Sequence, residues 1–281
     1  MDQHAKFSTM KRSLIFTALA TLILSLICSL AAAQTTAVDP KVSSTEKAEQ
    51  IIKRAIEAVG GSAYLNVHTV TGRGFFTPFH DGVSQVPTKF LDYIVFPDKE
   101  RTEFTSNGIR TVQANFGNEG WIFDGAVKTL NDQKPEQIED FKFGFRTSVE
   151  NILRGVWKSE GAKLSYIGRR EAGLAKRNET VRLTYPDGFW IEYEFGAKDG
   201  FPAKILYLRK HKNADTGESD ENPEADVLAK PITIAGVTAP WIIDHFIAGK
   251  QTGRIAYESV DYNKPVPDSL FVKPASVKAF K

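Results

Sequence analysis

The chain has 281 residues, of which 42% are hydrophobic and 25% are charged, with 36 basic side chains against 34 acidic ones. These proportions are typical of a globular protein, and they exclude a disordered, collagen-like or disulfide-scaffold chain. A net charge of +2 is too small to support sequence-independent binding of nucleic acid, and a single cysteine, Cys28, excludes paired-cysteine metal sites.

The first 33 residues have the pattern of a secretory signal peptide. They contain a basic pair, Lys11 and Arg12, an apolar stretch over residues 14–30, and three alanines that end at Ala33. We predict export to the periplasm with cleavage after Ala33, which removes three basic residues and one acidic residue and leaves 33 of each. An uncleaved anchor is the alternative, although a membrane-spanning helix would need about 20 apolar residues.

A single domain is predicted over residues 43–281, after a polar lead at residues 34–42 that we expect to be flexible. Its first element is a helix. Ser43 and Glu46 form a capping box, and apolar residues recur at helical spacing from there to Val59. The two glycines that follow Val59 predict where this helix ends.

From Val67 onward, short β-branched and aromatic runs are separated by turn residues. The spacing, about 8–12 residues per strand, is typical of an antiparallel meander rather than of βαβ units. Runs of this kind cover residues 67–77, 88–96, 101–105, 109–116, 120–123, 164–168, 179–185, 189–195, 203–209, 241–248 and 252–262, and a shorter one covers residues 232–234. Within residues 189–195, apolar residues alternate with Glu192 and Glu194, which predicts one buried face and one solvated face.

Two segments interrupt the strand pattern. Residues 135–157 have helical spacing, and Gly144 is expected to divide them into two short helices. Residues 211–230 form a polar acidic insertion, which we interpret as a solvated loop rather than a calcium site because its carboxylates lack the regular spacing of a calcium loop.

These elements predict a mainly β, α+β fold. Its centre is a single curved antiparallel sheet of about eleven strands, which forms a half-open β-barrel. The N-terminal helix and a central helical lid cover that sheet. A partly closed barrel of this size is too wide for its own side chains to fill, so we expect an apolar cavity inside it.

Five segments carry a resemblance to a known family. They are AEQIIKRAIEAVGG, FPDKERTEF, GNEGWIFDG, ITIAGVTAPWIIDHF and GRIAYESVDYNKPVPDSLFVKP, and together they extend from Ala48 to Pro274. In order and spacing the chain resembles the LolA/LolB-like lipoprotein-sorting proteins of the bacterial envelope. The resemblance implies a half-barrel with a helical lid, in which members of the family hold acyl chains and carry lipids or lipid-modified proteins across the periplasm. The acidic insertion departs from that pattern, and no arginine could be matched to the one that gates the carrier lid.

Motifs for catalysis are sparse. The sequence has no GxSxG, HExxH or phosphate-binding glycine loop, and no metal site or cofactor is predicted. His245 alternates onto the strand face of Trp241 and could serve as an acid/base or bind a ligand headgroup. We favour a structural histidine here; a hydrolase-type enzyme centred on His245 would need partners such as Glu258 or Asp261.

The sequence therefore favours a non-enzymatic, exported periplasmic binding protein that holds a lipid, or the acyl chains of a lipoprotein, as carrier or sensor. The expected partners are a lipid or acylated protein, an envelope protein and the membrane surface, with no nucleic acid. The alternative is a non-catalytic structural or protein-interaction module of the envelope. The residues expected to form the apolar cavity and lid are Trp121, Phe123, Phe141, Phe145, Val149, Ile152, Trp157, Phe189, Ile191, Tyr193, Trp241 and His245.

Overall fold

The structure is a computed structural model that describes residues 43–212 and 219–280. The predicted signal peptide, its cleavage site after Ala33 and the polar lead lie outside the described residues, as do residues 213–218 of the predicted insertion. None of the helices in the described part of the chain is both long enough and apolar enough to cross a membrane.

Four α-helices and fourteen strands make up the described residues. The helices are α1 (Ser44–Ala58), α2 (Ser62–Leu65), α3 (Pro135–Thr147) and α4 (Val149–Leu153), with short 3-10 helices at Val156–Glu160, Asp268–Leu270 and Val277–Phe280. The strands are β1 (Thr69–His80), β2 (Val83–Ser84), β3 (Thr88–Val95), β4 (Lys99–Ser106), β5 (Ile109–Phe116), β6 (Glu119–Asp124), β7 (Thr129–Asp132), β8 (Lys163–Glu171), β9 (Arg177–Thr184), β10 (Trp190–Gly196), β11 (Pro202–Lys212), β12 (Ser219–Ile234), β13 (Val237–Ile247) and β14 (Lys250–Tyr262).

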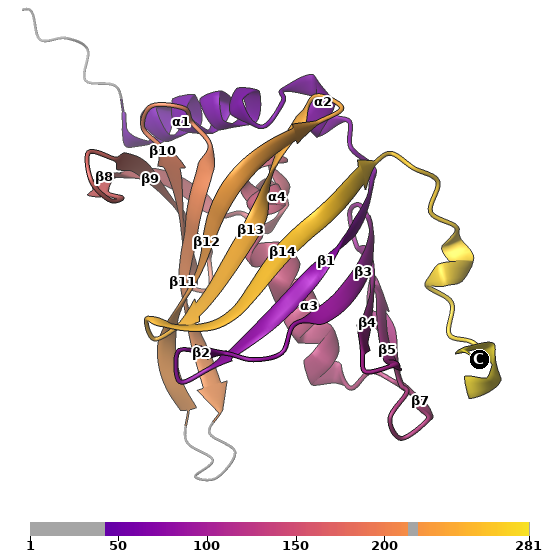
Figure 1. Cartoon of the computed structure of the whole chain (residues 1–281). Helices are drawn as coiled ribbons and strands as arrows, with labels where there is room; N and C mark the ends of the chain where they lie inside the picture. The colour runs from indigo at the N-terminus through magenta and orange to yellow at the C-terminus, as the bar shows by residue number, and fades with distance from the viewer. Residues whose placement is uncertain (1–42, 213–218, 281) are drawn as a thin grey trace, which may run out of the picture. The chain divides into compact units, whose positions relative to one another are not determined.

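All of these strands belong to one antiparallel sheet. Its spatial order is β7-β6-β5-β4-β3-β1-β14-β13-β12-β11-β10-β9-β8, and β2 adds a short pair to β1 (Figure 1). The pairing of β1 with β14 joins the two halves of the meander, while β7 and β8 remain at opposite edges. The sheet is therefore not closed, which confirms the predicted half-barrel class. The sequence missed β2 and β7 because two to four residues are too few to display a period of two.

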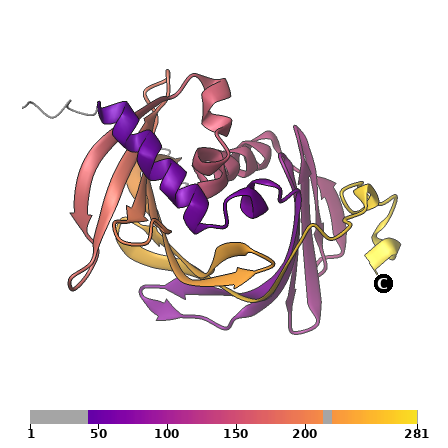
Figure 2. The same cartoon turned by 90° about the horizontal axis from the view of Figure 1, so that it is seen from above.

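A helical segment connects the two edges of the sheet. Strand β7 is followed in the chain by α3 and α4, and the next strand is β8 at the far edge. Seen from above, the sheet curves around these helices and around α1 and α2, so that all four lie on its concave side (Figure 2). The helical cover that the sequence predicted is therefore present, and the chain connectivity places it across the open side.

Helix α1 begins with the capping box that the sequence predicted. Ser43 and Glu46 satisfy each other's backbone N–H groups at 3.2 and 2.9 Å. The next two residues cover the edge of β8: Ser44 Oγ accepts from the Tyr166 N–H at 2.9 Å, and Thr45 Oγ1 donates to the Leu164 carbonyl at 3.2 Å. The helix thereby supplies partners for an edge strand that would otherwise expose its backbone.

The main core lies between α1, α4 and the concave face of β8–β11. It includes Ile51 and Ala55 of α1 and Leu183, Ile191 and Phe195 of the sheet, all at most 2% exposed. This packing fills one half of the half-barrel with protein side chains. The other half, beneath α3, is left unfilled by α1.

The prediction that Gly144 divides the lid was wrong. Helix α3 continues through Gly144 to Thr147, and the break comes at Ser148, whose Oγ accepts from the Asn151 N–H at 3.3 Å and so caps α4. A glycine inside a helix costs only about 1 kcal/mol relative to alanine, which tertiary packing can outweigh.

The prediction of a solvated loop over residues 211–230 was also wrong for the described residues. His211 and Lys212 end β11, and residues 219–234 form β12, which pairs with β11 on one side and β13 on the other. Pairing with β11 over residues 219–227 and with β13 over residues 224–234 outweighs the acidic composition. Glu224 and Asp226 then lie on the cavity side of the strand, where their neighbours are the hydroxyl of Tyr207 and the ring of His245.

The face of β10 that was expected to be solvated is buried as well. Glu192 and Glu194 are 1% and 5% exposed because arginines on neighbouring strands cover them. Arg182 and Arg170 contact the two oxygens of Glu192 at 2.6 Å each, and Arg170 reaches Glu194 at 3.3 Å. The alternation of apolar and acidic residues correctly predicted which side chains share a face. It could not show that long basic side chains would exclude water from the acidic face.

A close backbone approach holds the α1–α2 corner against the β12–β13 hairpin. A Cβ on Gly60, whose φ is +120°, would lie 2.1 Å from the carbonyl oxygen of Gly236. Beside it, the Thr238 N–H donates to the Val59 carbonyl at 2.9 Å. Only glycine fits this contact, which fixes the helical corner to one end of the sheet.

We predict that Gly60→Ala lowers the free energy of unfolding by at least about 3 kcal/mol, because backbone atoms must move apart as well as adopt a strained φ. The matched control is Gly188→Ala, where φ is +86° but a Cβ would meet nothing within 4 Å. That control should cost only about 1–2 kcal/mol. Denaturant unfolding of both variants tests the difference, and equal losses would contradict the role assigned to the Gly60–Gly236 approach.

Candidate functional site

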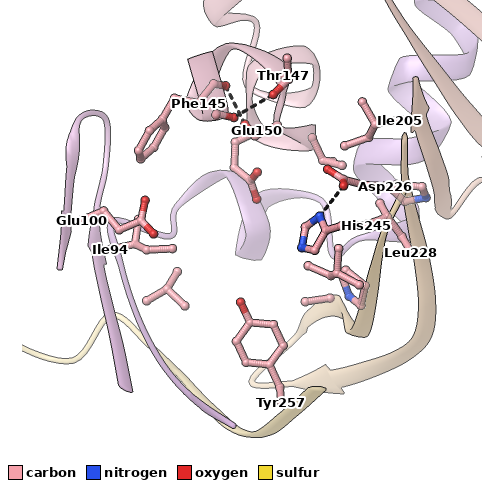
Figure 3. Close-up of a pocket in the computed structure, with 18 of the residues that line it drawn as sticks. Ile94, Glu100, Phe145, Thr147, Glu150, Ile205, Asp226, Leu228, His245 and Tyr257 are labelled. Carbon is pink, nitrogen blue, oxygen red and sulfur yellow. Dashed lines mark hydrogen bonds and ion pairs between the residues drawn. The ribbon is translucent and has the colours of Figure 1, made fainter. Parts of the chain in front are cut away.

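A cavity of about 830 Å³ lies between the concave face of the sheet and the helical segment. Its walls come from β3–β5 on one side, from β11–β14 on the other, and from the α1–α2 corner, α3 and α4. Small-molecule sites occupy roughly 300–1,000 Å³, so this space is large enough for a ligand. Figure 3 shows side chains from both walls and from the helices directed into it.

Much of the cavity wall is apolar. On α3, Phe141 and Phe145 pack edge to face with their ring centroids 5.0 Å apart. The apolar side chains that complete the lining are Val59, Val67, Val70, Ile94, Phe96, Phe104, Val149, Phe201, Ile205, Leu228, Val237, Ile243, Phe246, Ile247 and Val260. A wall of this composition suits a hydrocarbon group, since burying apolar surface is favourable and requires no specific direction.

Four of the twelve side chains singled out from the sequence line the cavity. They are Phe141, Phe145, Val149 and His245. Trp121 and Phe123 lie on the opposite face of the sheet, beneath the C-terminal segment. There the Trp121 indole donates to the Phe271 carbonyl at 2.7 Å, and the ring of Phe123 stacks on Phe280 at 4.0 Å.

The other six side chains also lie outside the lining. Ile152, Ile191 and Tyr193 are at most 1% exposed in the core beneath α1, and Trp157 and Phe189 pack against that core. Trp241 is half-buried on β13 and does not line the cavity. The number of aromatic residues could not show which of them line the cavity and which pack in the core, because both environments are apolar. The difference depends on which part of the sheet α1 covers.

His245 forms an ion pair across two strands. Its Nδ1 lies 2.5 Å from Asp226 Oδ1, and the two residues are directly opposite in the β12–β13 register. Burial lowers the pKa of His245, but the hydrogen bond and charge of Asp226, with further contributions from Asp244 and Glu224, raise it above the ordinary value overall. The other ring nitrogen faces the cavity (Figure 3).

The two partners that the sequence suggested for an enzyme centred on His245 do not line this cavity. Glu258 and Asp261 are exposed and do not line it. The described residues contain no group of three or more His, Cys, Asp or Glu side chains that could hold a metal ion.

A second polar group consists of two carboxylates that share one hydroxyl. Thr102 Oγ1 lies 2.9 Å from Asp92 Oδ1 and 3.4 Å from Glu100 Oε1. Burial raises the pKa of both acids, and the charge of Glu100 raises that of Asp92 further. Glu100 lines the cavity and is directed into it (Figure 3), whereas Asp92, on the same face of the sheet, lies outside the lining.

Arg154 lines the cavity, and its guanidinium contacts backbone carbonyls and aromatic rings of the cavity wall. Its two terminal nitrogens donate to the carbonyls of Val67 at 3.0 Å and Tyr64 at 3.1 Å, at the C-terminal end of α2. The guanidinium also stacks over the rings of Phe96 and Tyr64 at 4.2 and 4.8 Å. Arg154 thus fixes the helical corner through backbone carbonyls and aromatic rings rather than through an ion pair.

Sequence reasoning missed most of the polar residues of the cavity, including Glu100, Glu150, Asp226 and Tyr257. For Asp226 the sequence held a signal of its orientation, because Glu224, Asp226 and Leu228 are spaced two residues apart and share one strand face. For Glu150 there was none, since a glutamate in the first turn of a helix is ordinarily a solvated residue that favours the helix dipole.

Two solved structures share this fold. An outer membrane lipoprotein-sorting protein domain from Vibrio parahaemolyticus matches with a TM-score of 0.53 at 10% identity, over 81% of this chain and 97% of that one. A LolA superfamily protein from Nitrosomonas europaea matches with a TM-score of 0.52 at 12% identity, over 80% of this chain and 97% of that one.

No family model and no curated protein matches the sequence. The structural likeness shows that this chain has the LolA-superfamily fold, as the sequence resemblance implied. At 10–12% identity it shows the fold alone, because one fold carries many functions.

We predict that Asp92→Asn stabilises the protein by about 1–3 kcal/mol at pH 8, because the variant keeps an oxygen acceptor for Thr102 and removes a buried charge. An acid with a raised pKa contributes stability that is present at low pH and lost as the pH rises. The gain should therefore be absent near pH 4 and grow above it. Denaturant unfolding between pH 4 and 8 tests this, with exposed Glu119→Gln as the control for loss of charge. A gain that does not change with pH would contradict it.

We also predict a pH-dependent contribution from His245. Its raised pKa means that the ion pair with Asp226 stabilises the fold fully below about pH 6.5 and ceases to do so as the pH rises through the raised pKa. The side chain of His245 is 34% exposed, so solvent screening limits the effect to about 1 kcal/mol or less. Unfolding free energies of His245→Gln and of exposed His68→Gln should differ most at pH 5–6; a difference that increases with pH would overturn the assignment.

Proposed function

We propose that the protein is an exported periplasmic binding protein that holds a lipid, or the acyl chains of a lipoprotein, in the cavity beneath α3. The observation that supports this most directly is an open volume of about 830 Å³ with a largely apolar wall, in a protein otherwise packed to a dense core. The shared fold with a lipoprotein-sorting domain and a LolA superfamily protein is consistent with it.

The apolar wall supplies enough driving force for such binding. Each methylene that leaves water contributes about 0.8 kcal/mol, so a chain of ten methylenes would gain roughly 8 kcal/mol before the cost of ordering it. No catalytic group is needed for this function. A carrier or sensor requires only that the chain enters and leaves.

Helix α3 is the element that we propose moves to admit the chain. Its outer contacts are polar and partly exposed: Asp140 pairs with Arg209 at 2.5 Å, and Arg146 pairs with Glu160 at 2.9 Å. Exposed ion pairs contribute at most about 1 kcal/mol each, so the larger barrier to lid opening is the packing of Phe143 of α3 against Phe189 and Tyr207, with ring centroids 5.4 Å apart in each pair. The lid residues that would contact the chain are Phe141, Phe145 and Val149.

The alternative, a non-catalytic envelope interaction module, predicts a fully packed sheet interior. The open volume beneath α3 does not favour it. Contact with an envelope protein or with the membrane surface remains part of the carrier proposal, because an acyl chain must pass from a donor to an acceptor.

We predict that Gly144→Leu weakens binding of an uncharged alkyl probe at least tenfold. Gly144 lines the cavity, and a Cβ there would meet nothing within 4 Å, so the new side chain occupies ligand space without disturbing α3. Binding is measured by the fluorescence of N-phenyl-1-naphthylamine.

The matched control is Glu139→Leu, which adds the same side chain to α3 at an exposed position outside the lining. That variant should bind as the unmodified protein does. Failure of the unmodified protein to bind the probe, together with the absence of lipid in organic extracts of the protein purified from the periplasm, would contradict the proposed function.

A further inference from the structure

The cavity carries more acidic than basic side chains. The carboxylates in its lining are Glu100, Asp140, Glu150, Glu224 and Asp226, whereas the basic side chains there are Arg154 and His245. Apolar surface alone would accept any alkyl chain. The charges decide which headgroup can accompany the chain.

Three of these five carboxylates already have partners on the protein. Asp226 pairs with His245, Asp140 with Arg209, and Glu224 accepts from the Tyr207 hydroxyl at 2.9 Å. Arg154 is occupied by backbone carbonyls and aromatic rings. His245 is therefore paired with Asp226, and Arg154 donates to backbone carbonyls instead of pairing with Glu100 or Glu150.

Glu100 and Glu150 have no cationic partner among the described residues. Glu100 lies on β4 and accepts from the Thr102 hydroxyl at 3.4 Å, while Glu150 lies in the first turn of α4. Both side chains are directed into the cavity from different walls, and the Tyr257 hydroxyl points toward the same space from β14 (Figure 3). Burial raises the pKa of Tyr257, and so do the charges of Asp92, Glu100 and Glu150.

An independent observation comes from Tyr64, on the α2 side of the cavity. Tyr64 is 7% exposed, yet its hydroxyl has no hydrogen-bond partner among the described residues. Burial raises its pKa and the charge of Glu150 raises it further, whereas the charge of the neighbouring Arg154 lowers it. Leaving a buried hydroxyl without a partner is unfavourable, and a polar ligand group would supply the missing hydrogen bond.

We propose that the cavity selects amphiphiles with a primary ammonium headgroup, which Glu100 and Glu150 bind while the alkyl chain lies along α3. A primary ammonium carries one positive charge and three N–H donors, and the two carboxylates and the hydroxyls of Tyr64 and Tyr257 are available acceptors. A carboxylate or phosphate headgroup would instead lie against two carboxylates that have no ion-pair partner among the described residues. This inference rests on the proposed function and names the ligand class for the same cavity.

The test uses three probes with the same tail, decylammonium, decanoate and decanol, each titrated into the purified protein by calorimetry at pH 7.5. We expect decylammonium to bind at least tenfold more tightly than decanoate, with decanol between them. In the double variant Glu100→Gln/Glu150→Gln the preference for decylammonium should fall below threefold, while decanol binding is unchanged, which shows that the cavity remains intact.

The matched control is Glu119→Gln/Glu258→Gln, which removes two exposed carboxylates outside the cavity and should keep the full preference. Equal binding of the three probes, tighter binding of decanoate, or a preference that survives in the Glu100/Glu150 variant would overturn the headgroup inference and leave the proposed function standing. Absence of binding by all three probes would overturn both.

Discussion

The free edges of the curved sheet are the constraint on which the rest of the structure depends. Strands β7 and β8 end the spatial order at opposite sides, although they are consecutive strands in the chain. The chain between them must therefore cross the open side of the half-barrel, and it does so as α3 and α4. Because α1 fills only the half of the concave face formed by β8–β11, the crossing helices enclose a space that no side chain occupies.

Buried carboxylates in this structure differ in whether a cation accompanies them. Glu192 is 1% exposed but carries two arginines, and Glu179 is 2% exposed beside Arg169 and Tyr166. Glu100 and Glu150, which line the cavity, have no such cations. Burying a carboxylate is costly unless it is paired, so an unpaired carboxylate in a cavity is better explained by a ligand than by stability.

Much of the fold could be predicted from the sequence, because the signals were local. The capping box at Ser43 and Glu46, the alternation of β10 and the turn residues between strands each report on a few neighbouring residues. The cavity could not be predicted in the same way. Its lining combines Phe145, Glu100 and Tyr257, which come from distant segments, and whether an aromatic side chain lines a core or a cavity depends on where α1 lies. The acidic strand β12 was missed for the related reason that composition was given more weight than pairing with both neighbours.

The central claim is that the space beneath α3 holds an alkyl chain. The most direct measurement is a crystal structure of the purified protein with a decyl chain that carries a terminal bromine, located by its anomalous scattering. The account predicts a single bromine peak inside the cavity, between Phe145 of α3 and the wall formed by Leu228 and Ile243. A peak confined to the outer surface of the protein, with the cavity empty, would contradict it.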